Sequence, residues 1–156
     1  MITEVKAIPD NATGATPYLR IKGGVAALDF YTQAFGGVEY FRLPMADGRI
    51  GHADISIGTA RVMLSDEFPE MNIFGPKHLG GTSVAIQIYV RDVDAFAAHA
   101  VASGAKLTRP IKNEFYGDRV AILEDPFGHV WFFHTHIEDV SPAEIHKRMA
   151  AMGENT

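Results

Sequence analysis

The sequence predicts an α+β fold in which two tandem βαβββ modules form a curved, mixed β-sheet with a concave pocket, followed by a C-terminal helix. The first observation behind this prediction is that one order of strand and helix patterns occurs twice, over about residues 16–66 and about 84–137. The second is that a shift of 68 positions places Gly36, which ends the first helix pattern, on Gly104, which ends the second. Repetition at a fixed spacing indicates a duplicated structural unit.

The first module begins with a strand and a helix. In TPYLRI (16–21), Leu19 and Ile21 alternate with other residues, which is the pattern of a strand with one buried face. Over roughly 24–35 apolar residues recur at helical spacing, and the glycine at position 36 is expected to end this helix.

Three short strands complete the first module. They are expected near 38–43, 50–57 and 60–66. The tight turn Gly58-Thr59 between the last two suits a hairpin. The segment 67–83 that follows has no periodic pattern and is rich in glycine and proline, so it is predicted to be a linker.

The second module repeats this order and leads into one more helix. Its elements are expected at 84–90 (strand), 92–103 (helix), and near 105–111, 118–123 and 129–136 (strands). Asp92 is the predicted N-cap of the helix. Ser141-Pro-Ala-Glu144 is a capping box with proline at the first helical position, which predicts a C-terminal helix over about 141–152. Residues 1–156 are expected to form a single domain.

Composition narrows the classes of partner and compartment. The chain of 156 residues has 47% hydrophobic and 21% charged residues, as globular proteins do. Its formal net charge is −5 and its basic residues are scattered, so no nucleic-acid partner is expected. It contains no cysteine, which excludes disulfides and thiolate metal sites. No secretory signal and no apolar run of about 20 residues is visible, so we expect a cytoplasmic protein without a membrane partner.

The stretch EDPFGHVWFFHTH (124–136) poses the functional question. It is typical of a tight turn followed by a strand, and the period of two places Phe132, His134 and His136 on one face. Imidazoles on one strand face suit either a metal centre or the wall of a metal-free pocket.

Five fragments, spread over both modules, carry a family resemblance. They are ALDFYTQAFGG (27–37), GRIGHADISIG (48–58), YVRDVDAF (89–96), FYGDR (115–119) and EDPFGHVW (124–131). In this order they resemble the vicinal oxygen chelate superfamily, which includes glyoxalase I, extradiol dioxygenases, and bleomycin- and fosfomycin-resistance proteins. FYGDR and DPFGH are similar to a glyoxalase-like subfamily. The resemblance covers about residues 16–137 and implies a homodimer, with modules paired either within a chain or between chains.

The resemblance also implies where a metal would bind. In catalytic members the first and last strands of each module each supply one carboxylate or histidine. The matching positions here are Thr16, Met63, Ala85 and Phe132, none of which is an ordinary metal ligand. We therefore expect that the usual metal is lost and that no cofactor is bound.

An enzyme is the alternative. His52, Asp54 and His134 would give two histidines and one carboxylate, a set suited to a divalent metal such as Fe, Mn, Ni or Zn. The activity would then be that of a metal-dependent lyase, isomerase or dioxygenase. Without a metal, His134 is the candidate general base of an isomerase or hydrolase.

The leading hypothesis is a metal-independent protein that binds a small aromatic or anionic molecule in the concave pocket. The residues expected to line this pocket are Tyr18, Arg20, His52, Asp54, Met63, Gln87, Tyr89, Tyr116, Arg119, Phe132 and His134. Aromatic rings beside cations favour such ligands. Arg20 would need an acidic partner such as Asp54 if no ligand supplied one. Arg119 has a second interpretation, in which it pairs with a nearby carboxylate (Asp118, Glu124 or Asp125) to hold the hairpin.

Overall fold

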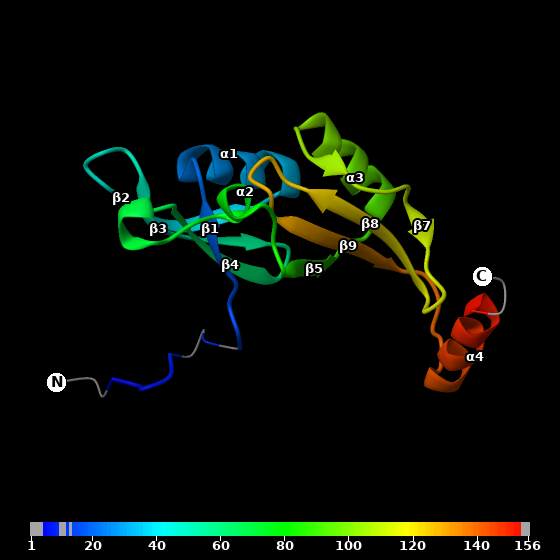
Figure 1. Ribbon diagram of the computed structural model, residues 1–156. Helices are drawn as coiled ribbons and strands as arrows, with labels where there is room; N and C mark the ends of the chain where they lie inside the picture. Colours follow the sequence, from blue (N-terminus) through cyan, green and yellow to red (C-terminus); the bar gives the residue numbers. More distant parts are fainter. Residues whose placement is uncertain (1–4, 10–11, 13, 154–156) are drawn as a thin grey trace.

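The computed structural model describes residues 5–9, 12 and 14–153, and it contains two β-sheets that lie side by side with two helices above them (Figure 1). The first module consists of β1 (Tyr18–Ile21), α1 (Gly24–Phe35), β2 (Val38–Pro44), β3 (Ile50–Ile57) and β4 (Ala60–Asp66). The second consists of β5 (Ala85–Tyr89), α3 (Val93–Ala102), β6 (Lys106–Leu107), β7 (Lys112–Asn113), β8 (Asp118–Glu124) and β9 (Val130–His136). The C-terminal helix is α4 (Pro142–Gly153).

Each module forms its own mixed sheet. The first has the order β1-β4-β3-β2 and the second β5-β9-β8-β6, with β7 also paired to β8. In both modules the first strand runs parallel to the last, and the other pairs are antiparallel. The predicted α+β fold with two repeated modules is therefore confirmed. One detail differs, because the expected curved sheet consists of two sheets with no ladder between them among the described strands.

Local signals in the sequence account for most element ends. Gly36 adopts the left-handed conformation (φ 65°) that glycine favours and ends α1. The carboxylate of Asp92 accepts a hydrogen bond from the backbone N–H of Ala95 at 3.0 Å, as predicted for the N-cap of α3. The strand expected near 105–111 is instead two short pieces, β6 and β7. Pro110 lies between them and has no N–H to donate to a ladder.

The predicted linker contains helical structure. A single 3₁₀ turn, η1 (Pro69–Met71), is followed by α2 (Pro76–Leu79). Proline starts α2, and Gly80 (φ 80°) ends it. A helix of one turn is too short to produce a hydrophobic period, so the sequence pattern could not reveal it.

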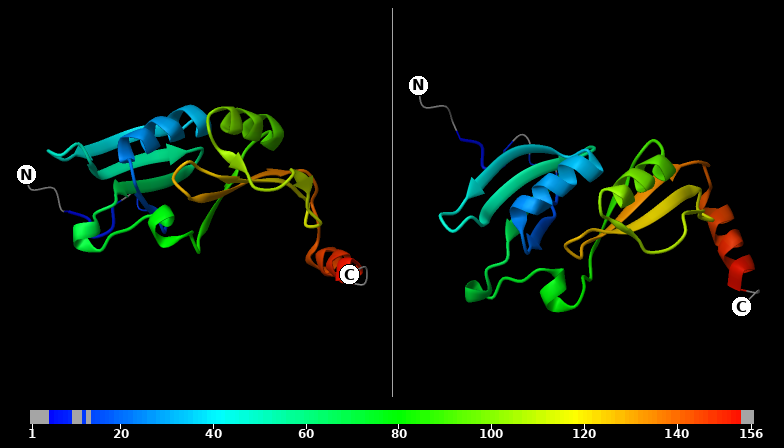
Figure 2. Two further views of the ribbon diagram at one scale, coloured as in Figure 1. Left: turned by 45° about the horizontal axis from the view of Figure 1, so that its top comes forward. Right: turned by 90° about the horizontal axis from the view of Figure 1, so that it is seen from above.

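The two modules share an aromatic core. Helices α1 and α3 lie next to each other on the same side of the sheets (Figure 2). Phe35 of α1 packs against Phe96 of α3 and against Trp131 and Phe133 of β9, with ring centroids 5.0–5.8 Å apart. Trp131 and Phe133 are fully buried. Burying a side chain of this size stabilises a fold by roughly 1.5–3 kcal/mol, so the shared core holds the modules together.

A buried carboxylate adds a polar link between the modules. Asp125, in the turn before β9, accepts hydrogen bonds from the hydroxyl of Tyr31 (2.7 Å) and from the indole N–H of Trp131 (2.9 Å). It also accepts the backbone N–H groups of Phe127 and His129, both at 2.9 Å. Burial, together with the neighbouring Asp125, raises the pKa of Tyr31 well above its usual value, so this hydroxyl remains a donor. The DPFGH turn thus has a structural role.

The faces of the sheets that lie away from α1 and α3 are open. Tyr18 (41% exposed) and Tyr89 (56% exposed) lie on these faces, together with Phe41 and Leu43 of β2. Helix α4 projects from the body of the molecule and has no buried residue (Figures 1 and 2). No helix among residues 5–9, 12 and 14–153 is long and apolar enough to span a membrane.

Candidate functional site

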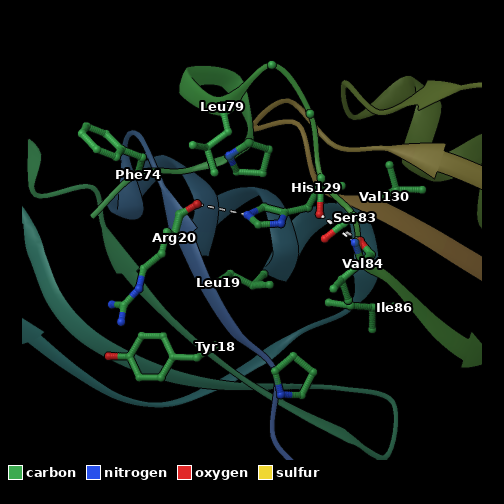
Figure 3. A pocket seen from close by; sticks show the side chains of 15 residues that line it. Tyr18, Leu19, Arg20, Phe74, Leu79, Ser83, Val84, Ile86, His129 and Val130 are labelled. Atoms are coloured by element: carbon green, nitrogen blue, oxygen red, sulfur yellow. Dashed lines mark hydrogen bonds between the residues drawn. The ribbon is translucent and has the colours of Figure 1, made fainter. Parts of the chain in front are cut away.

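A cavity of about 760 Å³ lies between β1, the segment around α2, and the first residues of β5 and β9 (Figure 3). Its lining is contributed by both modules and by the segment that joins them. The lining residues are Pro17, Tyr18, Leu19, Arg20, Phe74, Pro76, Leu79, Gly80, Gly81, Thr82, Ser83, Val84, Ile86, His129 and Val130. We refer to this space as the Arg20 cavity.

Arg20 supplies positive charge to the cavity. Its guanidinium group donates a hydrogen bond to the hydroxyl of Ser65 (2.5 Å) and lies 4.3 Å from the centroid of the Tyr18 ring. No carboxylate among the described residues forms an ion pair with Arg20, and the Asp54 partner considered from the sequence is engaged elsewhere. A half-buried guanidinium without a counter-charge is suited to bind an anion.

His129 forms a neutral polar part of the wall. It is buried, and its Nε2 lies 3.1 Å from the backbone carbonyl oxygen of Arg20. Burial lowers the pKa of His129, and this effect outweighs the opposing effects of Asp125 and the carbonyl hydrogen bond. Because a carbonyl oxygen only accepts, Nε2 carries the proton and Nδ1 is left as an acceptor. The remaining wall is mainly apolar, with Phe74, Leu79 and Val130 (Figure 3).

The other predicted residues of the first module lie on the open face of its sheet. The hydroxyl of Tyr18 hydrogen-bonds to Nδ1 of His52 at 2.7 Å, and Met63 is paired with Tyr18 in the ladder. Both carboxylate oxygens of Asp54 accept hydrogen bonds from Arg61. These bonds lower the pKa of Asp54, so it is a carboxylate already paired with a cation.

The predicted residues of the second module lie on the open face of the other sheet. In the ladder between β5 and β9, Gln87 pairs with Phe132 and Tyr89 pairs with His134. The ring of Tyr116, from the turn before β8, is stacked 6.3 Å from that of His134. Tyr89 and His134 hydrogen-bond to a carboxylate, Asp118, and none of these residues lines the Arg20 cavity.

Arg119 lies on the opposite side of the sheet from the predicted pocket. It forms a bidentate ion pair with Asp94 of α3 (2.5 and 2.7 Å) and also donates to Asn113 (2.9 Å). Side chains alternate along a strand, so the inward position of Asp118 directs Arg119 to the helix side. In the structure Arg119 therefore forms an ion pair between β8 and α3, and its partner is none of the three carboxylates expected.

The three candidate metal ligands, His52, Asp54 and His134, do not lie in one sheet. His52 and Asp54 are on β3 of the first sheet, whereas His134 is on β9 of the second. Across the described part of the chain, no three histidine, aspartate or glutamate side chains lie close enough to hold a metal ion. At two positions where relatives place ligands, Met63 and Phe132 offer a thioether and a hydrocarbon ring, so the donor set does not fit a divalent cation.

Most of the cavity lining was missed from the sequence, since only Tyr18 and Arg20 of its lining residues belong to the predicted pocket. Phe74 and Leu79 fall in the segment interpreted as a linker, and nothing in its composition indicates that it folds over β1. Asp118 was considered only as a partner for Arg119. The i, i+2 pair of histidines in HTH, opposite an aspartate on the neighbouring strand, was the signal that could have identified it.

Comparison with known proteins places the chain in a broad group. A model of the Glyoxalase/Bleomycin resistance protein/Dioxygenase superfamily matches residues 19–133. The uncharacterized protein Rv0887c of Mycobacterium tuberculosis is 37% identical over 142 residues, covering 89% of this chain and 84% of that protein. The crystal structure of TioX from Micromonospora sp. ML1 has a TM-score of 0.62 at 26% identity, covering 83% of this chain and all of that one.

The same fold occurs in a resistance protein. The fosfomycin resistance protein FosX from Listeria monocytogenes has a TM-score of 0.62, with 85% of this chain and 98% of that one covered. Its sequence identity is 14%, so this likeness concerns the fold alone.

Proposed function

The chain belongs to the Glyoxalase/Bleomycin resistance protein/Dioxygenase superfamily, and we propose that it binds a small aromatic anion in the Arg20 cavity without the metal used by catalytic members. The observation that carries this proposal is the half-buried guanidinium of Arg20, which has no acidic partner among the described residues and faces a cavity with aromatic walls. An anionic group on the ligand would supply the missing counter-charge.

The size and lining of the cavity support a ligand of this class. A volume of about 760 Å³ is within the range of ~300–1,000 Å³ that is usual for small-molecule sites. Phe74 and Tyr18 offer flat surfaces for an aromatic ring, and Leu79 and Val130 offer aliphatic contacts. The neutral His129 can accept a hydrogen bond without repelling the anion.

The test is a comparison of two probes that differ in charge. Benzoate and benzamide have the same ring, and we expect calorimetry to show tighter binding of benzoate. Arg20→Ala should weaken benzoate binding by about tenfold or more, since a hydrogen bond to a charged group contributes roughly 1.5–3 kcal/mol. Arg42→Ala is the matched control, because Arg42 is paired with Glu39 on the surface of β2. Equal binding of both probes, or equal losses in both variants, would refute the proposal.

We further propose that the open face of the first sheet pairs with a second copy of the chain. Phe41 (52% exposed) and Leu43 (54% exposed) lie beside His52 and Asp54 on the face of the first sheet. Large exposed apolar patches usually mark interfaces. Light scattering should give about twice the 17.0 kDa mass of the chain, and Phe41→Glu should shift the protein towards the single-chain mass. A single-chain mass at all concentrations would contradict this pairing.

A further inference from the structure

A buried carboxylate collects three side-chain hydrogen bonds on the open face of the second sheet. Asp118 (4% exposed) accepts from the hydroxyl of Tyr89 at 2.7 Å. It also lies 3.0 Å from Nδ1 of His134 and 2.9 Å from Nδ1 of His136. Burial by itself would raise the pKa of Asp118, but these three hydrogen bonds outweigh it and lower the pKa. Asp118 is therefore an acceptor at neutral pH.

This acceptor fixes the tautomer of His134. Because an ionised carboxylate cannot donate, Nδ1 of His134 must carry the proton that bonds to Asp118. In a neutral imidazole, Nε2 then has a free lone pair. His134 is only 3% exposed, and its Nε2 is buried without a hydrogen-bond partner in the described part of the chain. A buried polar atom without a partner costs about 1–3 kcal/mol, so such an atom requires an explanation.

The surroundings of this atom are aromatic. The rings of Tyr89, Tyr116 and Phe132 have centroids 5.4, 6.3 and 6.5 Å from that of His134. Tyr116 and Phe132 are nearly parallel to the imidazole, at 27° and 20°. All three aromatic side chains are at least partly exposed, so a flat molecule can reach the imidazole by displacing a surface ring without disturbing the core.

The charges near the imidazole leave Nε2 as an acceptor. Asp118 on β8 and the paired His136 on β9 lie on the Nδ1 side. The hydroxyl of Tyr89 on β5 is already used as a donor to Asp118. Burial raises the pKa of Tyr116, with a smaller contribution from Glu114, so this phenol is uncharged at neutral pH. Thus the unpaired Nε2 atom can form a hydrogen bond only with a donor.

We propose that Asp118 and His134 form a binding site for the hydroxyl group of a small aromatic molecule, with the ligand O–H donating to Nε2 and its ring stacking among Tyr116, Phe132 and Tyr89. Asp118 is a positioning residue, since it holds the imidazole in the tautomer that accepts. This site is distinct from the Arg20 cavity: it is on the open face of the second sheet, and His134 is four residues along β9 from Val130, about 13 Å at the rise of a strand.

The probes for this site are 4-methylphenol and its methyl ether, 4-methylanisole, with binding measured by titration at neutral pH, where the phenol is protonated. We expect 4-methylphenol to bind and 4-methylanisole to bind at least tenfold more weakly, because the ether has no proton to donate. His134→Phe keeps a flat ring but removes the acceptor, and it should weaken 4-methylphenol binding by at least tenfold. His99→Phe is the matched control, since His99 is an exposed histidine of α3 that bonds to the backbone carbonyl of Gln33, and it should have little effect.

Two results would overturn the proposal. One is equal binding of the phenol and the ether, and the other is unchanged phenol binding in His134→Phe. Since substitution of a buried residue can disturb folding, the tautomer is also tested in the unmodified protein by ¹⁵N NMR of the imidazoles. We expect a protonated Nδ1 and an unprotonated Nε2 in His134, and the opposite tautomer would refute the site. Arg20→Ala should leave 4-methylphenol binding intact, which separates this site from the proposed anion site.

Discussion

The hydrogen bond between Tyr31 and Asp125 provides a direct test of how the two modules are joined. The hydroxyl of Tyr31, on α1 of the first module, donates to the buried carboxylate of Asp125 in the second at 2.7 Å. Tyr31→Phe removes one oxygen and leaves the ring in its place among Phe35 and Trp131. The substitution therefore tests the polar link and preserves the aromatic packing.

The expected loss follows from the charge and burial of the partner. A hydrogen bond to a charged group contributes roughly 1.5–3 kcal/mol. Asp125 would keep its three remaining donors, from Phe127, His129 and Trp131, so the carboxylate would not be left unpaired. We therefore expect the free energy of unfolding to fall by about 1.5–3 kcal/mol, with no change in the denaturant dependence, because the surface exposed on unfolding is the same.

Urea unfolding at one fixed protein concentration measures this difference, since self-association would make the midpoint depend on concentration. Tyr40→Phe is the matched control: Tyr40 is 68% exposed, and its hydroxyl accepts a weaker bond from Ser56 at 3.2 Å. The control should lose less than about 0.5 kcal/mol, as surface substitutions do. If both variants lost the same free energy, or if Tyr31→Phe unfolded like the unmodified protein, the polar link would not join the modules.

Two further predictions concern the turn before β8 and the end of β9. At Gly117 (φ 100°) an added Cβ would meet a backbone carbonyl of the segment after β9, whereas at Gly36, where φ is also positive, it would meet open space. We therefore expect Gly117→Ala to destabilise the protein more than Gly36→Ala does. The midpoints of thermal unfolding of the two variants measure this difference. Hydrogen bonds to Asp139 and Asp118 raise the pKa of His136. Because the pKa of His136 is higher in the folded state, its ion pairs stabilise the fold fully below the unfolded-state pKa of about 6.5. This stabilisation is lost as the pH rises through the folded-state pKa. Unfolding of His136→Gln should therefore show a smaller loss of stability from about pH 6 to pH 8 than the unmodified protein, and identical pH profiles would contradict the assignment.

The elements that the sequence predicted well are those whose ends and buried faces are marked by residues within the element itself. Helix α1 has an apolar period and a glycine stop, and α3 has Asp92 as its cap, so local physics fixes both. The repeat of the two modules was visible for the same reason, since each module needs the same turns and buried strand faces. The period of two placed Phe132, His134 and His136 on one face of this strand, and Trp131 and Phe133 on the other face are fully buried.

Features that depend on contacts between distant segments could not be read from the pattern. The segment over the Arg20 cavity is held by a bond from the backbone N–H of Gly75 to Glu67 (2.7 Å), and by the close approach of Gly75 to the carbonyl of Arg20. Neither contact has a periodic signature. The side of the sheet on which Arg119 lies depended on where β8 starts, and one residue in that start reverses the face.

The duplication explains why the fold of this chain does not transfer a function by itself. A spacing of 69 positions relates Arg20 to Tyr89 and Ser65 to His134, and both pairs are in register, on β1 with β4 and on β5 with β9. Each module therefore has the same pair of adjacent positions, one on its first strand and one on its last strand. In the first module they hold a guanidinium bonded to a serine hydroxyl, and in the second a phenol and an imidazole that share Asp118. Equivalent backbone sites carry a guanidinium in one module and an imidazole bonded to a carboxylate in the other, so the chemistry of each face has to be argued from its own side chains.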